Sequence, residues 1–274
     1  AAEAGAHIEL VLQGVQGGPG TSVTHRAYSL VTPAPAPRHY EIAVQREPQG
    51  SGGSIAVHRL RPGDTIEARP PANNFPLDAD ARHSVLVAGG IGITPILSMA
   101  RQLAASGRSY RLEYLTRDRA VAAYADAVEA LGSSRLWHDG GATDRRVDAA
   151  QLLGPYAEGH HAYVCGPKPL VAAIVAAADA LGWPRAAVHH ELFAGVLEQT
   201  GDRPFRVRVA GVDGSHEVRP DQSVLEVLEQ AGLPILSDCR RGECGVCITP
   251  VLAGVPDHRD ASLTASERSE GKLL

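Results

Sequence analysis

Three cysteines near the end of the sequence constrain this chain more than any other feature. Cys239, Cys244 and Cys247 are spaced C-x4-C-x2-C within the stretch SDCRRGECGVC. This spacing is typical of a loop whose thiolates converge on a [2Fe–2S] cluster. Gly242 and Gly245 permit the close backbone approach that such a loop needs. A zinc site is the alternative, although zinc sites commonly use a second C-x2-C pair. Unrelated cysteines in a turn are a further alternative.

A [2Fe–2S] cluster needs four ligands, and the only other cysteine is Cys165, which lies in a different kind of segment. The C-terminal stretch resembles the cluster loop of plant-type ferredoxins. In these the fourth ligand follows the third by roughly thirty residues. That position lies just beyond Leu274. We therefore expect the chain to be a fragment whose fourth cluster ligand follows Leu274.

The composition excludes several classes of function. An apolar fraction of 44% and a charged fraction of 21% are typical of a globular protein. The net charge of −5 gives a nucleic-acid partner no electrostatic support. No apolar run reaches the roughly 18 residues of a membrane span. Few cysteines, three of them spaced as metal ligands, are typical of a reducing cytoplasm. We expect a cytoplasmic protein that binds neither nucleic acid nor a membrane.

The first part of the chain has the pattern of antiparallel strands. Strands are predicted over residues 6–12, 23–30 and 40–46, with no helix between them. Several short strands joined by Gly- and Pro-rich turns predict a small antiparallel barrel.

The second of these strands carries Arg26, Ala27, Tyr28 and Ser29. The planar fork of an arginine suits a phosphate, a tyrosine ring packs against a flat heterocycle, and a serine hydroxyl hydrogen-bonds to a ring nitrogen. An ordinary strand is the alternative interpretation of this short motif.

A Gly- and Ser-rich stretch follows over residues 50–54. The N–H groups of Gly52 and Gly53 and the hydroxyl of Ser54 are predicted to form an anion-binding nest. A flexible loop is the alternative. Residues 60–66 contain Pro-Gly and predict a turn between two strands.

The middle of the chain alternates between strand and helix patterns. A buried strand over 84–88 runs into GGIGITP and a helix over 96–105. Glycines let the backbone approach a pyrophosphate, and the helix N-terminus favours its negative charge. Thr94 is predicted to cap the helix and Pro95 to begin it. A structural turn is the alternative, because the third glycine of G-x-G-x-x-G is absent. The residues predicted to bind here are Gly89, Gly90, Gly92, Thr94 and Pro95.

A second strand over 110–116 ends where a cofactor ribose is commonly bound. Thr116, Arg117 and Asp118 lie at this end. An arginine suits a 2′-phosphate and an aspartate suits a free 2′-hydroxyl, so the choice between NADH and NADPH stays open. A solvated turn is the alternative. Helices are also predicted over 121–131 and 148–153, and a strand over 135–138.

A third strand over 162–165 ends in Cys165, Gly166 and Pro167 and is followed by an Ala- and Val-rich helix. A buried cysteine that fills space in a core is the ordinary role for such a residue. The stretch HHELF then closes this part of the chain at Phe193.

The last part of the chain has the pattern strand, strand, helix, cluster loop. A strand is predicted over 205–209, with its return over 216–218 after a Gly-rich turn. Ser223 and Glu226 form a capping box for a helix over 224–231. Gly232 ends that helix, and another strand is predicted over 248–252.

In this order the motifs resemble the ferredoxin-reductase family, and within it the phthalate dioxygenase reductase type. That type includes the reductase subunits of vanillate and related aromatic O-demethylases. The resemblance covers essentially the whole chain and implies a multidomain fold. Its parts are a flavin-binding antiparallel β-barrel over 1–80, an α/β NAD(P)H-binding domain over 81–200 and an α+β β-grasp ferredoxin over 201–274. Family barrels have six strands, so we expect the barrel to be incomplete at its N-terminus.

The resemblance also implies roles for individual residues. The Arg26–Ser29 motif lies along the flavin, and the Gly52–Ser54 stretch meets its phosphate. The C-G-P motif lies at the nicotinamide, and the acidic and aromatic residues of HHELF lie near the flavin ring. The residues implied to be catalytic are Ser29, Cys165, Glu191 and Phe193. In addition to the cofactor-contacting residues named above, the resemblance implies cofactor contacts for Gly166 and Pro167. It implies that the metal ligands are Cys239, Cys244 and Cys247.

The implied function is that of an oxygenase reductase. Family members with a C-terminal ferredoxin generally carry FMN, so we expect FMN, with FAD as the alternative, and NADH, with NADPH as the alternative. A flavin joins a two-electron hydride donor to a one-electron cluster. The expected partner is a Rieske-type oxygenase acting on an aromatic compound. The alternatives are a cytochrome P450 or another acceptor, and a redox-inert scaffold. Charged residues beside the cluster are predicted to steer docking or are merely solvated, and these are Asp238, Arg240, Arg241 and Glu243.

Overall fold

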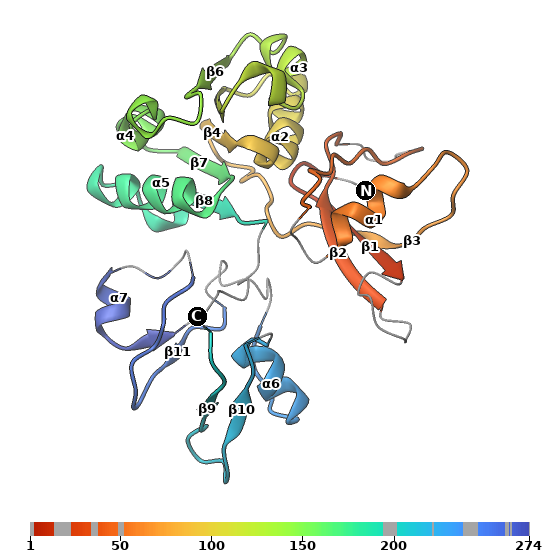
Figure 1. Ribbon diagram of the computed structural model, residues 1–274. Helices are drawn as coiled ribbons and strands as arrows, with labels where there is room; N and C mark the ends of the chain where they lie inside the picture. Colours follow the sequence, from red (N-terminus) through yellow and green to blue (C-terminus); the bar gives the residue numbers. More distant parts are fainter. Residues whose placement is uncertain are drawn as a thin grey trace. The chain divides into compact units, whose positions relative to one another are not determined.

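The computed structural model of the chain describes residues 3–13, 23–33, 38–48, 52–193, 202–220, 222–237, 246–260, 263 and 265–273. Contacts divide the chain into two compact units, Ala1–Glu191 and Leu192–Leu274 (Figure 1). The boundaries of the three predicted domains stay a prediction. Among the described helices, none has the length and apolarity that a bilayer crossing requires.

The first unit begins with a three-stranded antiparallel sheet in the order β2-β1-β3. Ile8, Leu10 and Leu12 alternate along β1 and are buried on one face, together with Leu30. The short helix α1 packs its apolar residues against this cluster. The elements are β1 (His7–Gln13), β2 (Val23–Ser29), α1 (Gly53–Arg59) and β3 (Glu67–Ala72).

Three expectations for this region are wrong. A helix, α1, is present where none was predicted, because Ala56 and Val57 gain burial on the sheet. Residues 40–46 form no continuous strand, and only an isolated bridge joins Ile42 to Leu30. The turn over 60–66 joins a helix to a strand and not two strands. Each outcome depends on packing against distant residues, which a local pattern does not contain.

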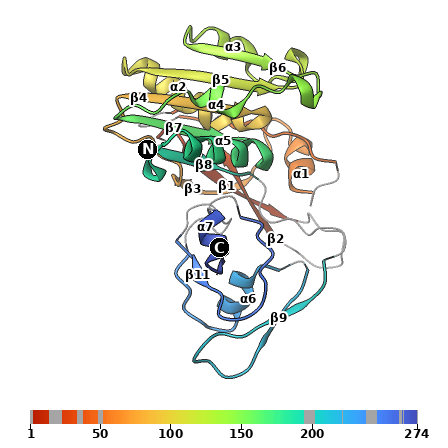
Figure 2. The ribbon, with the colours of Figure 1, turned by 90° about the vertical axis from the view of Figure 1, so that its left-hand side faces the viewer.

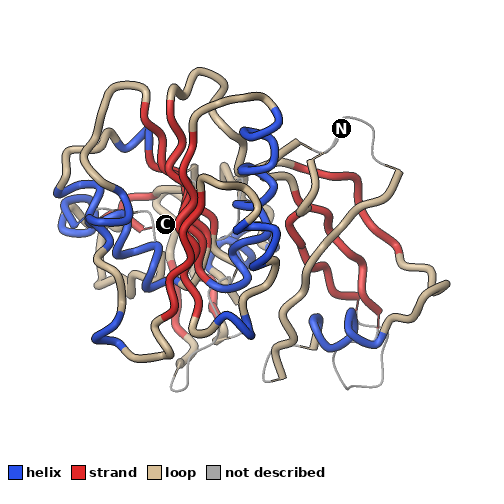
Figure 3. Tube along the Cα trace, turned by 90° about the horizontal axis from the view of Figure 1, so that it is seen from above, coloured by secondary structure: helices blue, strands red, loops and turns tan. Residues whose placement is uncertain are grey.

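The rest of the first unit is a five-stranded parallel sheet in the order β6-β5-β4-β7-β8. Seen from above, these strands stand between helices on both sides (Figure 3), and α4 and α5 lie in front of them in Figure 2. The chain leaves β4 in one direction to β5 and β6, and returns to the other side of β4 with β7. Ligands bind at such a switch point in open α/β sheets. The strands are β4 (His83–Gly89), β5 (Tyr110–Thr116), β6 (Ser134–His138), β7 (His160–Cys165) and β8 (Val188–Glu191), and the longer helices are α2 (Ile93–Ala105), α3 (Ala125–Glu129), α4 (Ala149–Leu153) and α5 (Lys168–Ala180).

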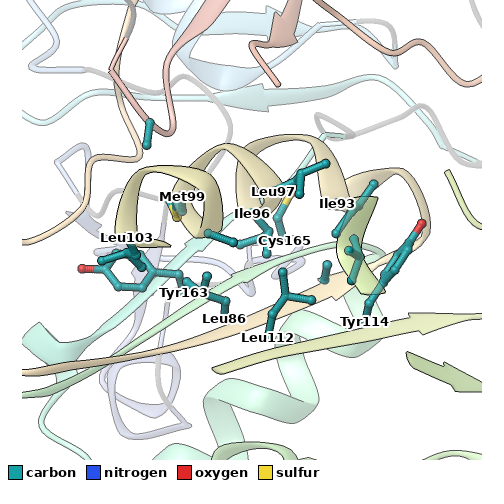
Figure 4. Close-up of a cluster of buried hydrophobic side chains, with 14 of the residues drawn as sticks. Leu86, Ile93, Ile96, Leu97, Met99, Leu103, Leu112, Tyr114, Tyr163 and Cys165 are labelled. Atoms are coloured by element: carbon teal, nitrogen blue, oxygen red, sulfur yellow. The ribbon is translucent and has the colours of Figure 1, made fainter. Parts of the chain in front are cut away.

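The main hydrophobic core lies between α2 and this sheet (Figure 4). Ile93, Ile96 and Leu97 recur at helical spacing along α2, and each is completely buried. They pack in one cluster with Leu86 and Leu112 of the sheet. Burying a side chain of this size stabilises the fold by about 1.5–3 kcal/mol, so the core holds α2 firmly beside the ends of β4 and β7.

The helix boundaries differ from the prediction at two places. A 3₁₀ turn over Gly90–Gly92 leads directly into α2, so Thr94 is an inner residue that donates to the Ile91 carbonyl at 3.1 Å and does not cap the helix. Pro95 is likewise the third residue of α2 and not the first. The helix predicted over 121–131 is reduced to α3, because Tyr124 adopts a left-handed φ of 57°.

The described residues of the second unit form small paired strands and two short helices. Ser223 accepts from the Glu226 N–H at 3.1 Å, and the Glu226 carboxylate accepts from the Ser223 N–H at 2.8 Å, so the predicted capping box is confirmed. The strand predicted over 248–252 is shorter than expected. The elements are β9 (Phe205–Val207), β10 (His216–Val218), α6 (Val224–Gln230), β11 (Thr249–Pro250), α7 (Ala265–Ser269) and β12 (Lys272–Leu273).

Candidate cofactor-binding site

The loops after β4 and β7 touch through their backbones. A Cβ added to Gly92 would lie 2.3 Å from the Cys165 carbonyl oxygen and 2.7 Å from the Gly166 nitrogen. Contacts under 3.0 Å with backbone atoms leave no room for a side chain. Since Gly92 has a φ of −60°, which any residue adopts, close approach alone requires the glycine. The structure therefore brings two of the predicted motifs to one point.

A second backbone contact joins the same loops. A Cβ on Gly166 would lie 3.0 Å from both Cα and N of Gly89, and one on Gly89 would lie 2.8 Å from the Pro167 ring. Gly90, between Gly89 and the helix, has a φ of +54° and open space beside it. A bare glycine backbone at the start of a thirteen-residue helix without a side-chain cap fits a bound pyrophosphate.

The three residues at the end of β5 that are predicted to bind a ribose differ from one another in burial and in hydrogen bonding. Thr116 is buried, and its hydroxyl lies 2.7 Å from Nδ1 of His138 and 3.3 Å from the Asp118 carbonyl. The Asp118 carboxylate accepts from the Ala120 N–H at 2.8 Å, and Arg117 is exposed. The prediction missed His138, although it ends a predicted strand at the same edge of the sheet.

Cys165 lies at the edge of the parallel sheet where the carboxyl ends of the strands meet. It pairs in register with Ala88 of β4 and with Glu191 of β8. Its side chain is completely buried in the core beneath α2 (Figure 4). The thiol therefore has the core role that a buried cysteine commonly has, while its backbone forms the contact with Gly92. Contact of Cys165 with a cofactor stays a prediction.

Glu191 and Phe193 differ in exposure. Glu191 is 3% exposed at the end of β8, whereas Phe193 is 40% exposed. An exposed aromatic ring is available to a flat heterocycle, but the part of the chain after it, residues 194–200, lies outside the described residues. The role of Phe193 beside a flavin stays a prediction.

Arg26 and Gly53 meet at the barrel sheet. A Cβ on Gly53 would lie 3.0 Å from Cγ and Nε of Arg26. Gly52 has a φ of +88° and lets the chain turn into α1. The hydroxyl of Ser54 accepts from the Glu47 N–H at 3.0 Å. A guanidinium beside a glycine backbone and a hydroxyl fits a phosphate group.

The other residues of that strand lie on alternating faces. Tyr28 packs with Ile8 and Leu10 on the core face of the sheet, and burial raises the pKa of its hydroxyl, with Arg26 opposing the shift. Ala27 is exposed and Ser29 is buried, and both lie on the opposite face. The four residues of the motif therefore do not form a single surface, and their contact with a flavin stays a prediction.

The cluster loop is only partly described. Cys247 is half-buried, whereas Cys239 and Cys244 lie outside the described residues. So do the predicted docking residues Asp238, Arg240, Arg241 and Glu243. Geometry therefore does not test this ligand set, and its identification depends on the sequence.

A stacked column of three rings on β7 and β8 predicts a pH effect. His189 stacks on Tyr163 at 4.6 Å and on His161 at 5.3 Å, and its Nε2 lies 3.0 Å from Nδ1 of His161. Burial first, and then the charge of His161, lower the pKa of His189 from 6.5 to about 4. The unfolded chain therefore binds more protons between these pH values. Stability from this group is fully present above about pH 6.5 and is lost towards pH 4, by on the order of 2 kcal/mol.

Hydrogen exchange measures this loss locally. We expect exchange in β7 and β8 to accelerate between pH 7 and pH 5, after correction for the intrinsic rate. His189→Gln keeps a polar group without a titrating proton and should reduce the pH dependence, leaving the part due to His190, whose pKa burial also lowers. The exposed His25 offers a matched control, since His25→Gln should leave it intact. If exchange accelerated equally in His189→Gln and in the wild type, the assignment of the pH dependence to His189 would be contradicted.

Comparison with known proteins identifies two regions of the chain. Residues 64–188 match the family described as "Dimethylamine monooxygenase subunit DmmA-like, N-terminal domain". Residues 207–274 match the "2Fe-2S iron-sulfur cluster binding domain", and this match includes all three cysteines of the loop. The iron–sulfur interpretation of the loop is therefore supported over the zinc alternative.

Similar proteins extend over almost the whole chain. The vanillate O-demethylase oxidoreductase of Pseudomonas sp. (strain HR199 / DSM 7063) is 39% identical over 98% of this chain and 84% of its own length. The solved structure of phthalate dioxygenase reductase, titled a modular structure for electron transfer from pyridine nucleotides to [2Fe-2S], is 38% identical, with a TM-score of 0.70 over 99% of this chain and 83% of that one. An intact type IV self-sufficient cytochrome P450 monooxygenase is 35% identical, with a TM-score of 0.65 over 99% of this chain and 35% of that one. These matches confirm the predicted multidomain fold class.

Proposed function

The chain belongs to the phthalate dioxygenase reductase family of oxidoreductases, and from this premise we propose that it transfers electrons from NADH through FMN and a [2Fe–2S] cluster to a Rieske-type oxygenase. That oxygenase would hydroxylate an aromatic ring or remove an O-methyl group, as the names of its relatives indicate. One observation supports this most: the backbone contact of Gly92 with Cys165 leaves a glycine backbone that fits a pyrophosphate, in a chain that also matches an iron–sulfur domain.

The residues of the chain bind and orient, and the cofactors supply the redox chemistry: a nicotinamide gives hydride, a flavin accepts it, and a cluster takes single electrons. Gly89, Gly90 and Gly92 would hold a pyrophosphate with backbone N–H groups. Arg26 would hold the flavin phosphate beside Gly53.

The proposed partner and location follow from composition and from the family. We infer a cytoplasmic reductase, since few cysteines beyond the cluster ligands suit a reducing compartment. The charged residues around the cluster, Asp238, Arg240, Arg241 and Glu243, are proposed to steer the oxygenase, because complementary charge mainly raises the association rate.

A cytochrome P450 is the second candidate acceptor. The similar self-sufficient P450 enzyme contains a region that covers 99% of this chain. The reductase half of the proposal is the same for both acceptors, so only the last electron transfer differs. Turnover with a Rieske oxygenase and with a P450, compared directly, distinguishes the two.

An absorption spectrum before and after anaerobic NADH tests the proposed function. We expect flavin bands over a broad iron–sulfur absorption, with both bleached by NADH. Flavin released by heat should run as FMN on chromatography, and FAD is the contradicting result. A colourless protein would support the redox-inert scaffold and reject the reductase.

A further inference from the structure

The first unit contains two lobes that share a core. We define the barrel lobe as residues 3–72 and the sheet lobe as residues 83–191. Ala4 and Val31 of the barrel lobe are buried in the same cluster as α2, together with Phe75 of the connecting segment. In addition, the Ala4 N–H donates to Gln102 of α2 at 3.1 Å. The lobes therefore stay attached without any further contact.

A polar cluster joins the lobes beside this core. Arg101 of α2 donates to the Val31 carbonyl at 3.0 Å and to the Thr32 hydroxyl at 3.1 Å. The Thr32 hydroxyl donates to Oε2 of Glu41 at 2.7 Å, and Arg101 lies 3.8 Å from the same carboxylate oxygen. From the sheet lobe, the Tyr124 hydroxyl donates to the other oxygen, Oε1, at 3.1 Å. One carboxylate thus receives donors from both lobes.

Tyr124 is held in an unfavourable backbone conformation. Among the described residues it is the only one other than glycine with a positive φ, at 57°. Such a residue persists only where its surroundings hold it, and such residues cluster at functional sites. Here the Tyr124 ring lies under the Arg101 guanidinium at 5.9 Å, and its hydroxyl reaches Glu41. The strained residue and the lobe contact therefore belong to one arrangement.

The polar cluster around Glu41 connects β2 and α2, and both of these elements carry residues that are predicted to bind a cofactor. Val31 and Thr32 directly continue β2, which ends at Ser29. Arg101 lies on α2, which begins at the glycine loop, and a rise of 1.5 Å per residue puts it about 12 Å from the first turn. A shift of β2 against α2 would therefore change the distance between the flavin and the nicotinamide.

We propose that Glu41, Arg101 and Tyr124, the inter-lobe clasp, are positioning residues for hydride transfer. This inference rests on the proposed function. The clasp holds the strand beside the flavin at a fixed register against the helix beside the nicotinamide. Hydride transfer depends steeply on such a distance, since a displacement of 1 Å costs about 100-fold in rate. Burial and Glu41 both raise the pKa of Tyr124, so its hydroxyl stays a donor at neutral pH.

Two conservative variants and a matched control test the clasp in the full chain. Tyr124→Phe removes the hydroxyl that donates to Glu41, and Glu41→Gln removes the carboxylate charge that faces Tyr124, Thr32 and Arg101, while both keep the shape of the side chain. Tyr110→Phe removes a buried hydroxyl that has no hydrogen-bond partner among the described residues and lies outside the clasp. The measurements are the rate of flavin bleaching at saturating NADH, the Kd for NADH and hydrogen exchange at residues 28–32. The backbone N–H of Val31, bonded to the Glu41 carbonyl at 3.0 Å, is the main exchange probe.

We expect each clasp variant to slow bleaching by roughly three- to tenfold, the size expected for the loss of an ordinary hydrogen bond. The Kd for NADH should stay unchanged, and exchange at residues 28–32 should accelerate even without NADH. The double variant should slow bleaching by less than the product of the two single effects, because the bond between Tyr124 and Glu41 is common to both variants. Tyr110→Phe should match the wild type.

Two results would overturn the clasp while leaving the proposed function intact. One is normal bleaching and normal exchange in both clasp variants. The other is faster exchange with an unchanged bleaching rate, which is what a purely structural contact would give. If the wild-type chain binds no flavin or is not bleached by NADH, the proposed function fails instead.

Discussion

Gly92→Ala should lower the rate of flavin reduction by NADH by about 100-fold, the effect of moving reacting groups by about 1 Å. The added Cβ would meet the Cys165 carbonyl oxygen at 2.3 Å and the carbonyl carbon at 2.5 Å. Neither the backbone of β7 nor that of the glycine loop yields cheaply, so the two loops must separate. Overpacking of this kind also costs about 1–3 kcal/mol of stability. Stopped-flow absorbance of the flavin at saturating NADH measures the rate.

Gly90→Ala is the matched control for this steric argument. Gly90 lies two residues away in the same loop, and a Cβ there would meet nothing within 4 Å. Its φ of +54° still penalises alanine, by roughly 1–2 kcal/mol. Its reduction rate should therefore fall far less than that of Gly92→Ala. Equal losses in both variants would show that loop strain, and not the contact with Cys165, limits the reaction.

Cys247→Ala should interrupt electron transfer at the [2Fe–2S] cluster. Removing one thiolate ligand should abolish the broad iron–sulfur absorption and the bound iron. Electron transfer to a one-electron acceptor such as cytochrome c should fall to the background of flavin alone. Flavin reduction by NADH should keep its normal rate, because the flavin and nucleotide sites are proposed to lie in the other compact unit.

Cys165→Ala distinguishes the remaining cysteine of the sequence from the three predicted cluster ligands. Cys165 is completely buried between α2 and the sheet in the first unit, so this variant should retain full iron content. The variant should lower the stability of the fold through lost packing in the core. If Cys165→Ala lost the cluster, or if Cys247→Ala kept it, the assignment of ligands from spacing would be wrong.

Short stretches of sequence correctly predicted the features that depend on interactions between residues close together in the chain. The capping box of Ser223 and Glu226 uses hydrogen bonds across three residues, and it formed as predicted. The strand β4 follows the apolar run over 85–88, which is typical of a buried parallel strand. The spacing of Cys239, Cys244 and Cys247 likewise identified the iron–sulfur domain, because one loop must supply all three thiolates.

Other features depended on contacts between distant residues, and local patterns did not contain them. Helix α1 forms because it covers apolar residues of the barrel sheet. Thr94 looks like a helix cap in sequence, yet burial of Ile93 starts the helix earlier. His138 was missed because its partner Thr116 lies on another strand.

The sequence by itself therefore determined the multidomain fold class, the iron–sulfur domain and the position of the glycines at the end of β4. Only the tertiary structure decided which of these glycines are required, since the need of Gly92 for a bare backbone comes from Cys165, far along the chain. It also brought Glu41 to Arg101 and Tyr124. The reason is physical: a turn, a cap or an apolar run acts over a few residues, whereas close approach and burial depend on how the whole chain closes.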